Sequence, residues 1–81
     1  MAVTVRLFAR LREIAGADEL QRSTDQVATV RDVWEALARE WPALAPYAPS
    51  LSCAVNAQYA RMTTAVADGD EVAFLPPVSG G

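Results

Sequence analysis

One segment of this chain has the pattern of a long amphipathic helix, and short alternating segments flank it on both sides. Its apolar stripe consists of Val30, Val33, Leu37 and Trp41, with Trp34 beside them. Thr29 can cap the first turn with Asp32 three residues later, as in a capping box, and Pro42 prevents continuation. The chain has 81 residues, which is one domain, and a lone helix can bury its stripe only against other elements.

The flanking segments alternate between apolar and polar residues, which predicts strands. In residues 2–8 the two faces carry Val3, Val5 and Leu7 on one side and Thr4, Arg6 and Phe8 on the other. Similar patterns predict strands over residues 51–56, 59–62 and 72–75, and a weaker one predicts a strand over 20–23. The sheet therefore has enough strands to cover the long helix.

Short helices and turns connect the strands. Residues 9–15 are predicted to form a two-turn helix that Gly16 ends. Two prolines within residues 43–50 predict a loop with one helical turn, and turns are expected at 56–58 and 68–70.

The order strand, short helix, strand, long helix and three strands predicts an α+β fold of the β-grasp (ubiquitin-like) type. In this fold a mixed sheet carries the long helix on one face, with short helices at its edges. We expect the β-grasp domain over residues 1–75 and a flexible Gly-Gly tail over residues 76–81.

Composition excludes several kinds of function. The chain has no histidine and no lysine, which removes the commonest general base and any side-chain amine for a Schiff base or isopeptide bond. The net charge of -3 without a basic run argues against nucleic-acid binding. The N-terminus lacks a signal-peptide pattern, no apolar run is long enough for a membrane span, and Cys53 is the only cysteine. We therefore expect a cytoplasmic protein with no membrane contact.

The C-terminal residues are suited to present a reactive carboxylate. Gly80 and Gly81 have no side chains, so this backbone can enter a narrow channel and present its terminal carboxylate. Pro76 and Pro77 end the last strand and direct the tail away from the sheet. A carboxylate becomes reactive after adenylation, and a sulfur donor can then displace AMP to leave a nucleophilic thiocarboxylate. The alternative is that the two glycines are simply a frayed chain end.

Three segments carry a resemblance to a known family. They are residues 8–13 (Phe-Ala-Arg-Leu-Arg-Glu), 54–56 (Ala-Val-Asn) and 68–81. The last is the most specific, because Gly-Asp-Glu-Val is followed there by Pro-Pro-Val-Ser-Gly-Gly. The chain resembles the small subunits of molybdopterin synthase over nearly its whole length. These subunits are ubiquitin-like sulfur carriers of molybdenum cofactor biosynthesis.

The resemblance implies roles for this chain and its partners. An E1-like adenylyltransferase would use ATP to adenylate Gly81, and a sulfurtransferase route would yield the thiocarboxylate. The chain would then donate sulfur to cyclic pyranopterin monophosphate. It would bind no cofactor and act as a non-catalytic subunit. The catalytic side chains, lysines included, would lie on the large subunit of a heterotetramer.

The resemblance also places the docking surface on the sheet face away from the long helix. The residues expected to contact the large subunit are Phe8, Tyr59, Leu75, Pro76, Pro77, Val78 and Ser79. Exposed large apolar groups beside the tail suit a protein partner. The alternative is that the first three cover loop edges or complete a minor core.

Other candidates for chemistry have simpler explanations. Cys53 alternates in register with apolar neighbours, which predicts a core thiol. Asp68, Asp70 and Glu71 could suggest a metal site, but carboxylates around a glycine turn favour solvated turn chemistry.

Two other functions stay open on the sequence. The chain could carry sulfur for thiamine or another pathway. It could also be a ubiquitin-like modifier, which would form amides with target lysines, or an interaction domain that tolerates loss of its tail.

Overall fold

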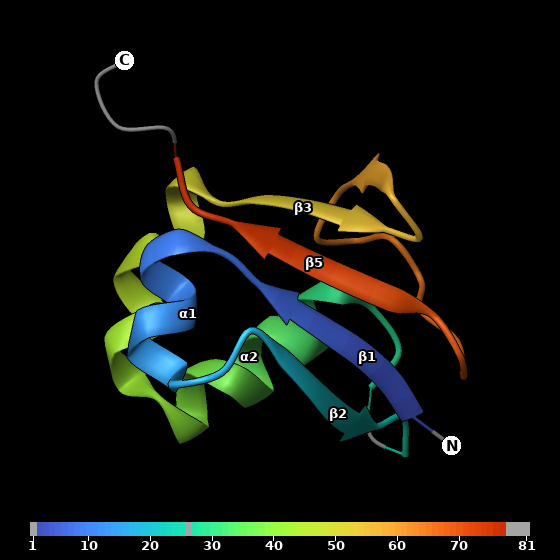
Figure 1. Cartoon of the computed structure of the whole chain (residues 1–81). Helices are drawn as coiled ribbons and strands as arrows, with labels where there is room; N and C mark the ends of the chain where they lie inside the picture. The colour runs from blue at the N-terminus through green and yellow to red at the C-terminus, as the bar shows by residue number, and fades with distance from the viewer. Residues whose placement is uncertain (1, 26, 78–81) are drawn as a thin grey trace.

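The computed structural model describes residues 2–25 and 27–77. Along the chain its elements are β1 (Ala2–Leu7), α1 (Ala9–Ala15), β2 (Glu19–Ser23), α2 (Val30–Glu40), the 3-10 helix η1 (Pro42–Ser50), β3 (Ser52–Val55), β4 (Gln58–Ala60) and β5 (Glu71–Leu75). The strands form one sheet, and α2 lies across the face that points away from the viewer in Figure 1.

The five strands are ordered β2-β1-β5-β3-β4 in a mixed sheet. The first and last strands pair in parallel at the centre, with Val5 opposite Val72 and Leu7 opposite Phe74. All other neighbouring strands pair antiparallel. This arrangement, with α2 on one face, is the β-grasp fold that the order of predicted elements indicated.

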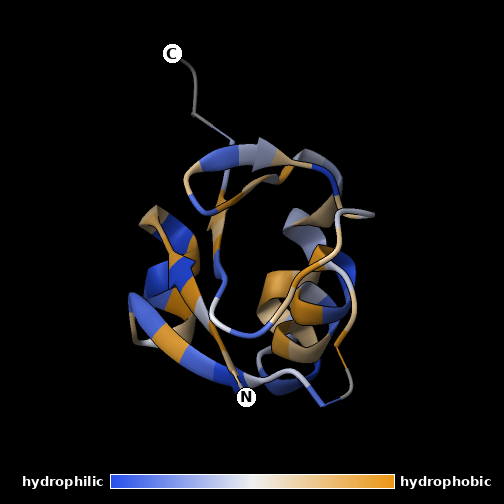
Figure 2. Ribbon diagram, turned by 90° about the vertical axis from the view of Figure 1, so that its right-hand side faces the viewer, coloured by the Kyte–Doolittle hydropathy of each residue, from blue (hydrophilic) through white to orange (hydrophobic). Residues whose placement is uncertain are grey.

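The core lies between the sheet and α2. Trp34 of α2 packs against Phe74 of β5, with ring centroids 5.0 Å apart. Burial of each large apolar side chain contributes about 1.5–3 kcal/mol, so these contacts dominate the stability of the domain. Figure 2 shows the alternation of hydrophobic and hydrophilic residues along the strands that face the helix. The buried residues are Val3, Val5, Leu7, Leu11, Val30, Val33, Trp34, Leu37, Leu44, Cys53, Val72 and Phe74.

The predicted capping of α2 is confirmed by its hydrogen bonds. The Thr29 hydroxyl accepts a hydrogen bond from the Asp32 backbone N–H at 3.3 Å, and the Asp32 carboxylate accepts from the Thr29 N–H at 3.1 Å. This reciprocal pair is a capping box. Gly16, the predicted stop of α1, has φ 74°, which is the left-handed conformation that glycine adopts freely.

Two connections differ from the sequence-based expectation. The segment predicted as a loop with one helical turn is the nine-residue η1, because Leu44 is buried and its N–H donates to Trp41 O at 2.9 Å. β4 ends at Ala60, short of the predicted residue 62. There the Arg61 N–H donates to the Thr64 hydroxyl at 3.0 Å and the chain turns. Among the helices of residues 2–25 and 27–77, none is long and apolar enough to cross a membrane.

Candidate functional site

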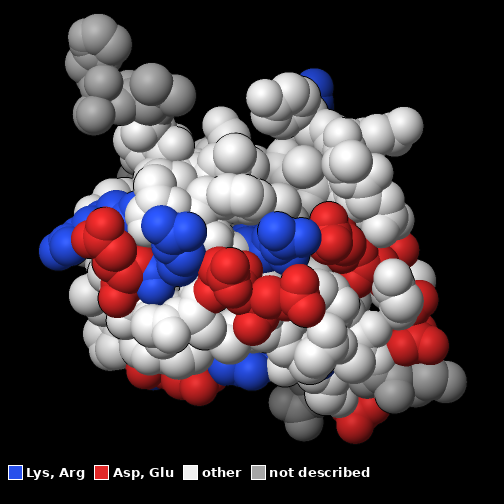
Figure 3. Space-filling model, viewed as in Figure 1, with Lys and Arg blue, Asp and Glu red and all other residues white. Residues whose placement is uncertain are grey.

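The face of the sheet opposite α2, here called the outer face, is formed by the strand residues that alternate with the core. Across the strands one row of this face contains Glu19, Arg6, Ala73, Ala54 and Tyr59. Figure 3 views the molecule from this side. Charged residues form a band across the middle, and most of the surface above this band in the picture is uncharged. The outer face therefore has one charged and one uncharged half.

The uncharged half contains the apolar residues predicted for docking. Phe8 is 39% exposed, Tyr59 is 87% exposed, and Leu75 is partly exposed. Because β1 and β5 are parallel and Leu7 is opposite Phe74, the next residues of both strands, Phe8 and Leu75, emerge at the same end of the sheet. The structure thus brings together two of the three predicted residues.

Tyr59 lies apart from this pair, on the edge strand β4. Between Tyr59 and β5 the face is made of Ala54 and Ala73, which pair with each other. These small residues form a floor between Tyr59 on one side and Arg6 on the other. The alternative assignment, in which the exposed apolar residues complete a minor core, does not fit the 87% exposure of Tyr59.

The start of the tail lies beside the Phe8–Leu75 end of this surface. β5 ends at Leu75, followed by a partly buried Pro76 and an exposed Pro77. The remaining predicted tail residues, Val78, Ser79, Gly80 and Gly81, lie outside the described residues. The end of β5 therefore shows where the tail leaves the domain, which is beside Phe8 and Leu75.

The turn that follows β1 fixes the position of Phe8. Ala9 has φ 53°, a left-handed conformation that is strained for a residue with a Cβ atom. In this turn the Leu11 N–H donates to Phe8 O at 3.1 Å, so α1 begins directly after Phe8. Such strain at a surface that also carries exposed aromatic groups is typical of functional sites.

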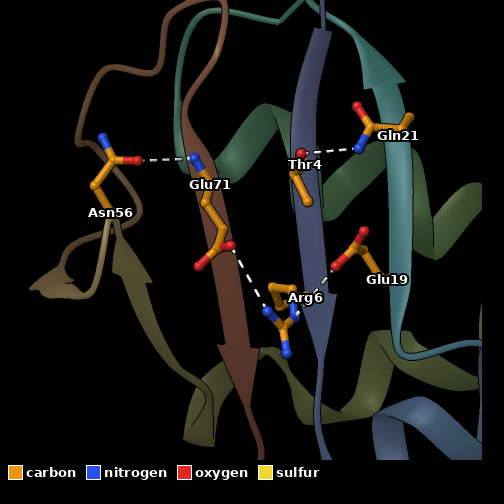
Figure 4. Close-up of polar contacts among 6 residues, drawn as sticks. All are labelled: Thr4, Arg6, Glu19, Gln21, Asn56 and Glu71. Carbon is orange, nitrogen blue, oxygen red and sulfur yellow. Dashed lines mark hydrogen bonds and ion pairs between the residues drawn. The ribbon is translucent and has the colours of Figure 1, made fainter.

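In the charged half, Arg6 lies between Glu19 and Glu71. Figure 4 shows its guanidinium flanked by the two carboxylates, which come from β2 and β5. The Arg6 Cζ atom also lies 5.8 Å from the centre of the Phe8 ring. Sequence analysis assigned no role to Arg6, although its alternation with Thr4 and Phe8 had placed it on the outer face.

Two segments that carry the family resemblance meet at the opposite end of β5. The Asn56 side chain donates to Asp70 Oδ1 at 3.0 Å and accepts from the Glu71 N–H at 2.9 Å. The hydrogen bond from Asn56, joined by one from the Ala67 N–H, lowers the pKa of Asp70. Asn56 therefore joins the β3–β4 turn to the start of β5, which is a structural role.

The carboxylates around Gly69 serve the fold in the same way. Asp68 Oδ1 accepts from the Ala2 N–H at 2.7 Å, which holds the start of β1 against this turn. Within residues 2–25 and 27–77, no group of three or more acidic or cysteine side chains is arranged to hold a metal ion. Turn chemistry accounts for Asp68 and Asp70 without a metal.

Cys53 is a core residue, as its register predicted. It is 5% exposed, and its thiol donates to Ala60 O at 3.3 Å. Burial raises the pKa of this thiol, which keeps it protonated and unreactive.

Comparison with known proteins identifies the family. Residues 5–81 match the ThiS family. The chain is 42% identical to the molybdopterin synthase sulfur carrier subunit of Haemophilus influenzae, over 98% of this chain and 99% of that protein. It is 37% identical to small archaeal modifier protein 1 of Haloferax volcanii, over 94% and 97% of the two chains.

A solved structure agrees with the sequence relatives. The crystal structure of SAMP1 from Haloferax volcanii has a TM-score of 0.83 and 34% identity, and it covers both chains completely. Family, relatives and fold coincide over the whole length, so this chain belongs to the ThiS family of ubiquitin-like β-grasp proteins.

Proposed function

We propose that this chain is the sulfur carrier subunit of a molybdopterin synthase and that its C-terminal carboxylate on Gly81 carries the sulfur. The observation that carries the proposal is the place where the tail begins. Leu75, the last strand residue before it, lies beside Phe8 on an uncharged surface that suits a protein partner. The relative from Haemophilus influenzae, which matches over nearly the whole of both chains with 42% identity, bears this name.

The chemistry requires an activated carboxylate. Attack of the Gly81 carboxylate on the α-phosphorus of ATP forms an acyl-adenylate and releases pyrophosphate. A donor at the oxidation level of hydrosulfide then displaces AMP, which leaves a C-terminal thiocarboxylate. Neither step needs a histidine or lysine from this chain, which contains neither. An E1-like adenylyltransferase would supply the catalytic groups for activation.

The sulfur acceptor in this proposal is cyclic pyranopterin monophosphate, bound to the large synthase subunit. Extended residues span about 3.3–3.6 Å each, so the five residues after Pro76 can reach about 16–18 Å into a partner. That reach lets the domain dock through the outer face while the terminus reacts at a distance. The glycines at positions 80 and 81 suit a narrow channel.

A second function has its own support. The 37% identity to a small archaeal modifier protein suggests that a chain of this kind can be joined to other proteins through its terminus. In that case the activated Gly81 would form an amide with an amine of a target. The two functions share activation and differ in the final acceptor.

Intact-mass analysis distinguishes these outcomes. The full-length chain is incubated with ATP, an E1-like enzyme and a sulfur donor. We expect a mass gain equal to the replacement of one oxygen by sulfur, and its loss when the large subunit and the pterin precursor are added. Appearance of amide-linked adducts instead would favour the modifier function.

Deletion of Gly81 provides the matched control. The shortened chain should gain no sulfur, because Ser79-Gly80 would not present the terminus at the required depth. Its circular dichroism spectrum and melting temperature should equal those of the full chain, since β5 ends at Leu75. Full molybdopterin synthesis by the shortened chain would refute the role of Gly81.

A further inference from the structure

Arg6 makes only long contacts with the acidic groups around it. Its Nε atom lies 3.9 Å from Glu19 Oε1, and its Nη1 atom lies 3.7 Å from Glu71 Oε2. Both distances exceed hydrogen-bond range, so the two carboxylates attract Arg6 without accepting its protons. Within the described part of the chain the buried Nε atom has no hydrogen-bond partner. Among the described residues Arg6 is therefore a charged group with one donor, Nε, that no protein acceptor satisfies.

One part of the guanidinium points toward the docking surface. In Figure 4 the third nitrogen of Arg6 points away from both carboxylates, along β1 toward its C-terminal end. Phe8 follows in this direction, 5.8 Å from the Arg6 Cζ atom to the ring centre, and holds the guanidinium by a cation–π contact. This third nitrogen thus borders the apolar residues at the start of the tail.

The backbone around Arg6 is fixed on both sides. On β2, the Gln21 side chain donates to the Thr4 hydroxyl at 2.8 Å, which joins this strand to β1. On β5, the Asn56 side chain accepts from the Glu71 N–H at 2.9 Å. Both contacts are drawn in Figure 4. A partner would therefore meet a pre-positioned guanidinium, which lowers the entropic cost of binding it.

We infer that Arg6 is the polar anchor of the docking surface and donates hydrogen bonds to an uncharged acceptor on the protein that receives the tail. This inference rests on the proposed function. The acceptor is a backbone carbonyl or a side-chain amide, because Glu19 and Glu71 already outweigh the charge of Arg6. A third carboxylate would be repelled, whereas a carbonyl oxygen would satisfy the free donors.

Substitution of Arg6 by lysine tests the anchor. Arg6→Lys keeps the positive charge between the glutamates but loses the planar fork and its directed donors. Binding of the full-length chain to the large synthase subunit is measured by titration calorimetry. We expect affinity to fall about tenfold or more, the usual effect of removing a hydrogen bond from a charged group, with an unchanged melting temperature.

Two further variants complete the test. Arg39→Lys, on the exposed side of α2 behind the sheet, is the matched control and should bind like the parent chain. Arg6→Met removes the charge as well and should weaken binding at least as much as Arg6→Lys. Because the acceptor is uncharged, the affinity ratio between the parent and Arg6→Met, which has lost the charge, should stay constant from low to high salt.

The outcomes separate this inference from the proposed function. Parent-like binding by Arg6→Lys and Arg6→Met, together with weak binding by Leu75→Lys, would refute the anchor and leave the docking surface standing. An affinity ratio that falls toward one in high salt would overturn the uncharged acceptor. If Leu75→Lys and Phe8→Ala also bind like the parent, the outer face is not the docking surface and the anchor inference fails, whereas the sulfur-carrier proposal is still decided by the mass gain at Gly81.

Discussion

At the scale of single residues, three non-glycine residues of the described ranges 2–25 and 27–77 have a positive φ. Ala9, Asn56 and Ala57 all have positive φ, at 53°, 51° and 69°. Asn56 tolerates this conformation well and uses it to reach Asp70 and Glu71. The two alanines gain no such contact, so each stores strain of about 1–2 kcal/mol.

The turn between β3 and β4 allows that strain to be measured. Ala57→Gly should raise the free energy of unfolding by about 0.5–1 kcal/mol. Glycine relieves the Cβ clash, and the greater conformational entropy of its unfolded chain offsets only part of this gain. Urea denaturation followed by circular dichroism measures the change. Ala67→Gly, at a loop position without positive φ, is the control and should lower stability. A lower midpoint for Ala57→Gly would contradict the strain.

At the scale of elements, hydrogen bonds and an ion pair hold both ends of α2. The 61–66 segment closes over the start of α2, where the Val30 N–H donates to Thr64 O at 2.9 Å. At the other end of α2, Arg22 of β2 pairs with Glu40 at 2.7 Å and lies 5.7 Å from the centre of the Trp41 ring. The edge strand β2 is therefore held to the last turn of α2.

The capping box of α2 should make stability depend on pH. Hydrogen bonds from the Ala28 and Thr29 N–H groups lower the pKa of Asp32. A carboxyl group with a folded pKa below its unfolded value stabilises the fold above the unfolded pKa, and this contribution is lost as pH falls through the folded pKa. Asp32→Asn should therefore lower the melting temperature at pH 7, and its difference from the parent should shrink in acid.

Melting curves across the acid range check this dependence. Glu35→Gln, on the exposed side of the same helix, controls for the loss of one negative charge. Its melting temperature should stay close to that of the parent at every pH. A gap between Asp32→Asn and the parent that stays constant down to low pH would assign the effect to packing instead of ionisation.

At the scale of the whole molecule, the sheet separates stability from recognition by its two faces. Phe74 and Leu75 are neighbours in sequence, but Phe74 is fully buried against Trp34 and Leu75 lies on the outer face. Substitutions at the two positions should therefore affect different properties.

Leu75→Lys should weaken binding to the large synthase subunit by about tenfold or more, because it places a charge in the apolar docking surface. Its melting temperature should change by less than about 4 °C, as for most surface substitutions. Phe74→Ala is the contrasting variant and should cost about 3–5 kcal/mol of stability. A comparable loss of stability for Leu75→Lys would show that its side chain belongs to the core.

The fold was predictable where local signals and packing agree. The α2 stripe, its Thr29 cap and Pro42 all indicate the same helix, and the alternation around Val5 and Phe74 places the core face of two central strands. The weak strand at residues 20–23 is an edge strand, where only Leu20 and Arg22 are partly covered, so its alternation carries less information. η1 could not be foreseen, because burial of Leu44 depends on the tertiary position of that segment.

The candidate site was predictable in part for the same reason. Alternation alone placed Phe8, Tyr59 and Leu75 on the outer face, but only the parallel β1–β5 pairing brings Phe8 and Leu75 to the same end. The unused donors of Arg6 depend on distances to side chains from two other strands. Such distances follow from strand register, which single-strand patterns do not contain.

The central place of β5 has a mechanical consequence if, as proposed, the tail is drawn into a partner. A pull on Pro76 is directed along β5, and the ladders to β1 and β3 both run beside this strand. Ladder hydrogen bonds lie across the strand direction, so this load shears two rows together instead of opening one row bond by bond. The domain can therefore resist traction on its tail and keep its shape while the partner holds the terminus.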